Sequence, residues 1–180
     1  EELLFKSAAG KYPMDSSPDG RYMLFETTDP KTKEDLWVLP LAGERKAFPY
    51  VQSAASAYSG HFSPDGRWIA YSSDESGKYE VYVQAFPLTQ GKWQVSTAGG
   101  AAPLWSKDGK ELFYLAPDKK LMAVAVKGTG TSFEEGIPKA LFDTDVDVYV
   151  AADRYAVSRD GKRFIINTSV EGTSTKPIMV

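Results

Sequence analysis

One five-residue pattern, Ser-x-Asp-Gly followed by Arg or Lys, occurs four times in this chain of 180 residues. The copies lie at residues 17–21, 63–67, 106–110 and 158–162, and their aspartates are 46, 43 and 52 residues apart. A pattern that recurs at a nearly constant period is typical of repeat architectures, in which each copy marks one structural unit. The sequence therefore predicts four tandem units.

The Asp-Gly pair of each copy lies between two strand-like runs, which is a strong hairpin signal because glycine accepts a positive φ. The Ser and Asp side chains of the pattern can also bond nearby backbone N–H groups and hold the turn. We therefore interpret the pairs as structural turn residues without a chemical role. They are Asp19, Gly20, Asp65, Gly66, Asp108, Gly109, Asp160 and Gly161.

Each turn is followed by an apolar run, a polar or glycine-containing connector and a second run, and most units close with a third, weaker run. The apolar runs do not alternate with polar residues, which is typical of strands covered on both faces. The weaker runs predict edge strands at 45–48, 93–96 and 139–142. Four strands in each repeat of this length are the signature of a β-propeller blade, and no segment predicts a helix.

We therefore expect an all-β chain, a β-propeller with four four-stranded blades in a single domain, residues 1–180. The expected blades are approximately 8–50, 51–98, 99–143, and 144–180 completed by a strand at 2–6. Two arrangements remain open. Residues 2–6 could pair beside 177–180 and close a small ring, which removes exposed sheet edges. Alternatively, the four units are a slice of a larger ring, with open blade faces that a second copy of the chain could cover as a homodimer.

Composition excludes several classes of function. The net charge is −3 and no basic stripe is present, so we expect no nucleic-acid partner. The absence of cysteine removes disulfides, thiolate metal sites and a cysteine nucleophile. No apolar run is long enough to span a bilayer, so this segment does not insert into a membrane. We predict no metal and no cofactor. The chain opens with Glu1-Glu2 and carries no signal peptide, which favours an excised piece of a longer protein.

Residues 62–71, followed by 80–83, resemble the TolB-type, WD40-like (PD40) propeller repeat, and the resemblance extends over essentially all of the chain. Stretches 35–41, 91–97 and 109–115 are similar to the carboxy-terminal propeller of bacterial membrane serine/threonine protein kinases. That resemblance implies an extracytoplasmic sensor or interaction domain, periplasmic or at the cell surface, tethered to a kinase. The kinase motifs themselves are absent, so no kinase activity is expected of these residues. Lys107 and Arg159 replace the proline in repeats three and four, and we expect little effect on the turn.

The acidic run 143–147 resembles the start of a calcium loop, but Val148 and Arg154 stand where that loop needs glycine and glutamate. A solvated loop is therefore favoured over an ion site in a propeller channel at Asp145 or Asp147. With Asp153, these two aspartates are the only clustered carboxylates that the sequence offers for catalysis.

His61 lies on a short innermost strand, and a Ser-His-Asp triad is not favoured because Gly-x-Ser-x-Gly is absent and Asp65 belongs to a turn. Such a histidine more often lines the channel. Among the aromatic residues, Tyr58 and Trp105 are expected nearest a channel mouth. The candidate binding residues are Tyr58, His61, Trp105, Asp145, Asp147 and Asp153.

The function that these observations favour is a non-catalytic binding module for a protein or peptide partner, since four repeats are intact and no acid, base and nucleophile converge. One alternative is the propeller portion of a hydrolase similar to prolyl oligopeptidase, or of another enzyme with carboxylates in its channel. A third hypothesis is a purely structural fragment of a larger protein, which predicts poor solubility or dimerisation when it is expressed alone.

Overall fold

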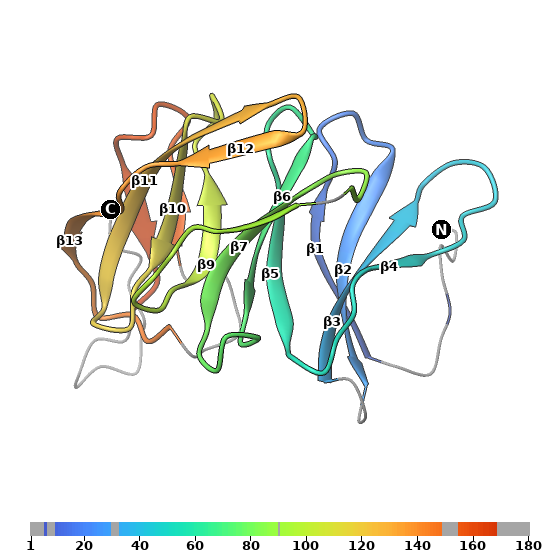
Figure 1. The fold of residues 1–180 in the computed structure, drawn as a ribbon, viewed down its shortest axis with the longest axis horizontal. Coiled ribbons are helices and arrows are strands. Elements are labelled where there is room, and N and C mark those ends of the chain that lie inside the picture. Colours follow the sequence, from blue (N-terminus) through green and yellow to red (C-terminus); the bar gives the residue numbers. More distant parts are fainter. Residues whose placement is uncertain (1–5, 7–9, 30–32, 90, 149–154, 169–180) are drawn as a thin grey trace.

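The computed structural model describes residues 6, 10–29, 33–89, 91–148 and 155–168. All regular elements within these residues are β-strands, and neighbouring strands pair antiparallel (Figure 1). The first two sheets have four strands each, in chain order from one edge to the other. They contain β1 (Gly10–Ser16), β2 (Tyr22–Asp29), β3 (Lys33–Pro40) and β4 (Phe48–Val51), then β5 (Ala57–Phe62), β6 (Trp68–Ser73), β7 (Glu80–Ala85) and β8 (Lys92–Gln94). The edge strand expected at 45–48 thus begins only at Phe48.

The third sheet contains an addition that the sequence pattern did not predict. It is built from β9 (Ala101–Trp105), β10 (Glu111–Leu115), β11 (Lys120–Thr129), β12 (Ser132–Glu135) and β13 (Lys139–Asp143). The first part of β11 pairs with β13, the expected edge strand, while Val126–Thr129 pairs with β12. We call this extra hairpin, residues 126–135, the β11–β12 arm.

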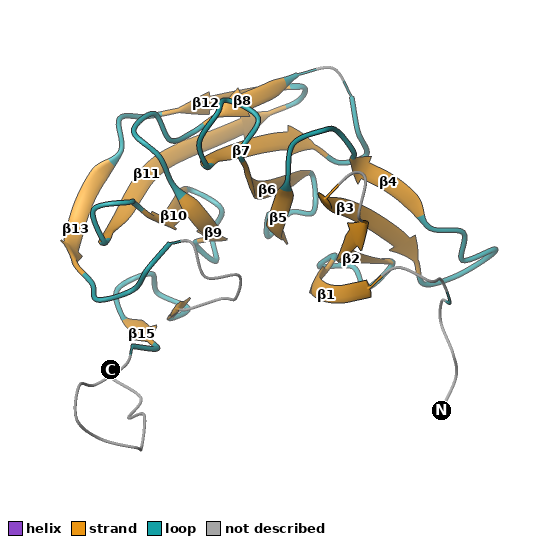
Figure 2. Cartoon of the chain, turned by 90° about the horizontal axis from the view of Figure 1, so that it is seen from below, coloured by secondary structure: helices purple, strands orange, loops and turns teal. Residues whose placement is uncertain are grey.

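The fourth repeat contributes β14 (Tyr155–Val157) and β15 (Phe164–Ile166), which pair with each other. The strand expected at its end and the closing strand at 2–6 lie outside the described residues. Figure 2 shows the sheets following one another around an open arc, with β1, β5 and β9 on its concave side and β4 and β8 on its convex side. The first sheet and β15 lie at opposite ends of this arc, so the described blades form a slice of a propeller.

The core lies between the sheets, in three clusters that we call junctions 1–2, 2–3 and 3–4 after the repeats they join. Every residue of β6 is buried. Its Ile69 and Tyr71 belong to junction 1–2, while Trp68 and Ala70 belong to junction 2–3. Both faces of a middle strand are therefore covered by apolar neighbours, which is why the runs in the sequence do not alternate.

The repeated pattern forms one kind of turn at all four places. The turn spans five residues between its strands in the first three repeats and six in the fourth, longer than a two-residue hairpin, and Gly20 has φ 70°. The hydroxyl of Ser17 donates to Asp19 Oδ1 at 2.6 Å and accepts from the N–H of Tyr22 at 3.0 Å. The hydroxyl of Ser17 and the backbone N–H of Arg21 lower the pKa of Asp19 to about 2. The predicted structural role of these residues agrees with this geometry.

Consecutive turns also contact each other through the proline of the pattern. A Cβ placed on Gly66 would lie 3.4 Å from Cδ of Pro18, and one on Gly109 would lie 3.6 Å from Cδ of Pro64. The turns at Gly109 and Gly161 keep φ 70° although Lys107 and Arg159 replace the proline there. The expectation of little effect on the turn is confirmed, and each proline lies close to the glycine of the next turn.

Candidate functional site

Junction 1–2 is centred on one aromatic ring that comes from the residue directly after β7. Phe86 lies 5.0 Å from Tyr22, 5.1 Å from Phe62 and 6.1 Å from Tyr50, measured between ring centroids. The first two contacts are edge-to-face, the arrangement that the aromatic quadrupole favours. The N–H of Phe86 donates to the carbonyl oxygen of Arg67 at 2.7 Å, which fixes its place beside the second turn.

Junction 2–3 repeats this plan with larger rings. Phe133 is the central ring, at 5.2 Å from Trp68, 5.9 Å from Trp93 and 6.1 Å from Trp105. This ring, however, arrives from β12 of the arm. The position equivalent to Phe86 is Val126, whose N–H donates to the carbonyl oxygen of Lys110 at 2.8 Å, as that of Phe86 does to Arg67.

A pocket of about 360 Å³ lies at junction 2–3, between the second and third turns and the β11–β12 arm. We call it the turn-face pocket. The lining residues are Ser63, Pro64, Asp65, Arg67, Trp68, Trp105, Asp108, Gly109, Lys110, Val126, Lys127, Gly128 and Phe133.

The rim of the turn-face pocket carries two ion pairs, one in each turn. Arg67 lies 2.8 Å from Asp65 Oδ2, and Lys110 Nζ lies 3.9 Å from Asp108 Oδ2. Burial opposes ionisation of Asp65, yet hydrogen bonds from Ser63 and Arg67 hold its pKa below the ordinary value. The pKa of Asp108 is lowered in the same way by its own turn. Both carboxylates are therefore already satisfied within the protein.

One wall of the pocket holds a buried donor. Trp68 is 2% exposed, and its Nε1–H has no hydrogen-bond partner among the described residues. The indole packs against Gly128, where a Cβ would come within 2.6 Å of Trp68 Cε2 and closer still to Nε1. Only glycine permits this approach, so the position of the arm depends on Gly128.

A second polar feature lies at junction 1–2, near the β2–β3 and β6–β7 connections. Glu26 is buried, and burial followed by repulsion from Glu34 raises its pKa to about 7. Glu34 Oε2 accepts the hydroxyl of Ser56 at 2.6 Å, and Asp74 Oδ1 accepts the N–H of Ser56 at 2.8 Å. The sequence analysis missed this pair of glutamates. The signal was available, because Glu26 directly follows an apolar run that is covered on both faces.

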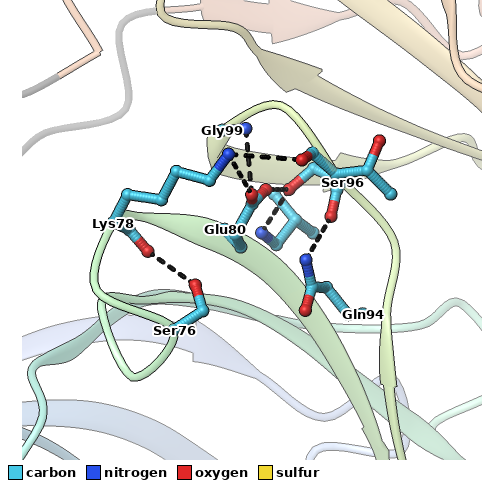
Figure 3. A network of polar contacts seen from close by, with 8 residues as sticks. Ser76, Lys78, Glu80, Gln94, Ser96 and Gly99 are labelled. Carbon is cyan, nitrogen blue, oxygen red and sulfur yellow. Dashed lines mark hydrogen bonds and ion pairs between the residues drawn. The ribbon is translucent and has the colours of Figure 1, made fainter.

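Figure 3 shows a third polar group, around Glu80, which is completely buried. Its Oε1 accepts the N–H of Gly99 at 3.0 Å and lies 3.1 Å from Lys78 Nζ, while Oε2 accepts the hydroxyl of Ser96. The charge is paired and hydrogen-bonded on every side, as a buried carboxylate requires. Glu80 therefore ties the β8–β9 connection to β7 and is a structural group.

The aromatic residues expected at a channel mouth are buried. Tyr58 is 8% exposed and packs edge-to-face on Tyr79 at 5.1 Å. Trp105 is 9% exposed and donates its Nε1–H to the carbonyl oxygen of His61 at 3.1 Å. His61 Nδ1 lies 3.7 Å from Asp15 Oδ2. Of these three, the turn-face pocket includes only Trp105.

The acidic run after β13 alternates in exposure. Asp145 and Asp147 are exposed, while Thr144, Val146 and Val148 between them are buried. Asp153 lies outside the described residues. Among the residues that the structure describes, no group of three His, Cys, Asp or Glu side chains is arranged to hold a metal ion. A binding role for these aspartates stays a prediction.

Several solved structures share this fold. TolB from Acinetobacter baumannii is 18% identical with a TM-score of 0.74, and the match covers 99% of this chain and 42% of that one. The periplasmic gluconolactonase of Pseudomonas aeruginosa is 17% identical, with a TM-score of 0.54 and coverage of 93% and 56%. The β-propeller domain of the Trilobed protease from Pyrococcus furiosus is 15% identical, with a TM-score of 0.53 and coverage of 93% and 52%.

These matches define the class of the protein. The open arc of antiparallel sheets, together with the repeated turns that join their strands, is that of a β-propeller. Its fold is TolB-like. The chain spans about half the length of the solved structures it matches. No protein-family model matches the chain, and no curated protein sequence matches it. At these identities the similarity establishes the fold alone.

Proposed function

We propose that this chain is a non-catalytic binding segment of a larger propeller protein and that it holds a protein or peptide partner on the face formed by the repeated turns. The observation that supports this most is the turn-face pocket, a recess between two turns whose lining is both polar and apolar and whose rim is charged. Recesses of this kind are the default binding sites of folded domains. Loops held by a rigid framework also carry recognition more often than the framework does.

The turns are suited to this task because their own hydrogen bonds fix them before a partner arrives. Ser63 holds both Asp65 and the N–H of Trp68, and Ser106 holds Asp108 and the N–H of Glu111 in the same way. A surface that is ordered in advance loses little conformational entropy on binding. The turn face therefore offers preformed contacts.

The wider context follows from the resemblance to kinase-associated propellers. On that basis we place the segment outside the cytoplasm, as the sensor or interaction part of a longer protein. A copy of the chain covering the open blade faces is a further proposal, which the mass in solution tests. The described residues include no helix with the length and apolar character needed to cross a membrane.

The test is selection of a random heptapeptide display library on the immobilised chain. We expect enriched sequences whose synthetic peptides shift the amide resonances of residues 63–67 and 106–110. The control region is the opposite end of the sheets, around Ser56 and Asp74, which should stay unperturbed. Absence of any enriched peptide, or binding confined to the control region, would contradict the proposal.

A second candidate function is catalysis, and the observation that favours it is the pair Glu26 and Glu34. A carboxyl group with a pKa of about 7 is half ionised near neutral pH, which suits a general acid or base. On this hypothesis Glu26→Gln abolishes turnover of a glycoside or lactone substrate while the fold is retained. A substrate screen that finds no turnover by the wild-type chain rejects it.

A further inference from the structure

We infer that the turns of repeats 3 and 4 bind an acidic segment of the partner, rich in Asp and Glu, through six cationic side chains that we call the basic patch. This inference rests on the proposed function and adds the chemistry of what is bound. All six residues are exposed. They are Lys107, Lys110, Lys127, Arg159, Lys162 and Arg163.

The residues of the basic patch come from neighbouring parts of the molecule. A Cβ placed on Gly161 of the fourth turn would lie 4.0 Å from Glu111 Oε2, and Glu111 directly follows the third turn. Lys127 adjoins the third turn because the N–H of Val126 donates to the carbonyl oxygen of Lys110 at 2.8 Å. The two turns and this part of β11 therefore form one continuous surface.

The arginines that end the pattern in repeats 1 and 2 are held by their own turns. Arg21 donates its Nε–H to Asp19 Oδ2 at 2.6 Å, and Arg67 donates its Nε–H to Asp65 Oδ2 at 2.8 Å. The planar guanidinium presents its donors in fixed directions, which suits a carboxylate. These two cations are therefore already paired.

Lysine at the same position in repeats 3 and 4 leaves its charge available to a partner. Lys110 Nζ lies 3.9 Å from Asp108 Oδ2, beyond hydrogen-bond distance, and both side chains are largely exposed. Lys162 forms no ion pair with any residue that the structure describes. Exposed pairs such as that of Lys110 add little stability, so the carboxylate of a partner can replace Asp108 at small cost.

The second position of the pattern adds charge to the same two turns. It holds Pro18 and Pro64 in repeats 1 and 2, but Lys107 and Arg159 in repeats 3 and 4. Neither cation forms an ion pair within the described part of the chain, and the same is true of Lys127. The surplus of positive charge is therefore a property of repeats 3 and 4 and not of the motif itself.

Three anionic side chains, Asp108, Glu111 and Asp160, stand among the six cations. The two aspartates are engaged by their turns, because Asp108 accepts the hydroxyl of Ser106 at 2.8 Å and Asp160 that of Ser158 at 2.5 Å. With all three anions counted, this surface has a net charge of +3 in a chain whose total is −3. Such a local field attracts an anionic partner and fixes its register.

The charge of the whole chain favours a short acidic peptide over a nucleic acid. Outside the basic patch and its three anions, the remaining residues carry a net charge of −6. A nucleic acid carries phosphates along its whole length and would meet repulsion beyond the patch. A short acidic segment can be confined to the two turns.

A labelled hexapeptide, Glu-Asp-Glu-Glu-Asp-Glu, tests the inference by fluorescence anisotropy on the wild-type chain. The control is its uncharged analogue, Gln-Asn-Gln-Gln-Asn-Gln. We expect saturable binding of the acidic peptide, with at least a roughly tenfold lower affinity for the control. Binding should weaken as sodium chloride rises from about 20 to about 150 mM, because exposed charges are screened. Equal affinities for the two peptides would overturn the inference.

Two double variants with the same change of net charge locate the site. Lys107→Glu/Arg159→Glu reverses two charges of the basic patch, and we expect a roughly tenfold loss of affinity for the acidic peptide. Lys46→Glu/Lys139→Glu reverses two exposed lysines outside the patch and should bind nearly as the wild type does. Circular dichroism and the thermal midpoint establish that both fold. Equal losses would show that only total charge matters and would contradict the inference.

Removal of the remaining anion gives a change of opposite sign. Glu111→Gln takes a negative charge from beside the fourth turn, and the affinity for the acidic peptide should rise about twofold or more. An unchanged or lower affinity counts against the basic patch. An oligodeoxythymidine of similar length that binds more tightly than the acidic peptide would identify a nucleic-acid surface and reject the inference.

The peptide selection separates this inference from the proposed function. Enriched heptapeptides that bind the turn face without an excess of Asp and Glu sustain the function and reject the inference. A library without binders, together with no binding of the acidic hexapeptide, rejects both. Enriched acidic heptapeptides that shift the amide resonances of residues 106–110 and 158–163 sustain both.

Discussion

Junctions 1–2 and 2–3 surround a central phenylalanine with three aromatic rings, but they obtain that phenylalanine in different ways. Phe86 belongs to the chain leaving β7 and is bonded beside the second turn. Phe133 is carried by the β11–β12 arm, and among the described strands β12 pairs only with the end of β11. The same repeat motif therefore frames a filled junction and one with a pocket of about 360 Å³.

This difference shows how a repeat protein can keep its framework while the source of a central ring changes. The turns and the strand pairing are kept at both junctions, while junction 2–3 has larger surrounding rings and takes its central ring from the inserted hairpin. Function is grafted onto a fold in such local departures from the repeat.

The largest expected effect separates the two central rings. Phe86→Ala should lower the free energy of unfolding by about 3–5 kcal/mol, the usual loss for a buried phenylalanine. Phe133→Ala should lose less, about 1–2 kcal/mol, because the arm can detach locally and the loss cannot exceed the cost of that opening. Urea denaturation measures both. Equal losses would show that the arm is as firmly integrated as the chain after β7.

The next effect compares two glycines that permit close packing. Gly128→Ala should cost about 1–2 kcal/mol, because the new methyl group meets the rigid indole of Trp68 and local opening of the arm limits the loss. Gly60→Ala at junction 1–2 should cost about 1 kcal/mol, since the nearest atom is the flexible Cδ2 of Leu24. Gly10→Ala, which meets only ordinary contacts, is the control. Thermal denaturation of the three variants ranks their losses of stability. A larger loss for Gly60→Ala than for Gly128→Ala would contradict the close packing of the arm on Trp68.

A smaller effect depends on pH and belongs to junction 1–2 alone. The pKa of Glu26 is raised from 4.5 to about 7. At the equivalent position of β6 stands Ser72, a neutral residue that accepts a hydrogen bond from the N–H of Ala102 at 3.0 Å. Below pH 4.5 the carboxyl is protonated in both states and costs nothing. As pH rises towards 7 only the unfolded chain ionises, so the wild type loses stability relative to Glu26→Gln.

Above about pH 7 that difference should stay constant. Allowing for screening by solvent, we expect it to reach about 1–2 kcal/mol. Urea denaturation of both proteins from pH 4.5 to 8 measures it. A difference that does not grow over this range would mean that Glu26 is solvated.

The smallest effect concerns the stacked turns. Pro64→Ala should cost about 0.5–1 kcal/mol, because the unfolded chain gains freedom and the contact with Gly109 is lost. Pro18→Ala should behave alike through Gly66. Lys107→Pro should instead gain a few tenths of a kcal/mol by restricting the unfolded chain. Thermal midpoints of the three variants, measured in parallel, test these values. A midpoint of Pro64→Ala equal to that of the wild type would show that the proline has no packing role.

The sequence predicted the repeat well because each copy of the motif folds on itself. Ser17, Asp19 and Gly20 lie within a few residues of one another, and their hydrogen bonds require no distant partner. The long apolar strands were also predictable, because their burial on both faces requires an apolar residue at nearly every position. The β11–β12 arm was missed because it occurs in the third sheet and not in the first two, so it is no part of the recurring pattern.

The candidate sites were harder to predict because they depend on residues from different repeats. Trp105 looked like a channel residue, yet the third sheet turns it towards the carbonyl of His61 and the ring of Phe133. Glu26 became notable only when the fold placed it beside Glu34 in a buried junction.

By itself, then, the sequence determined the turns, the four-stranded units and their order, since these follow from contacts between residues close in the chain. Only the tertiary structure decided that Phe133 of the arm takes the central place at junction 2–3 that Phe86 takes at junction 1–2. A pocket is the volume left over when several elements have packed, and no single segment encodes it.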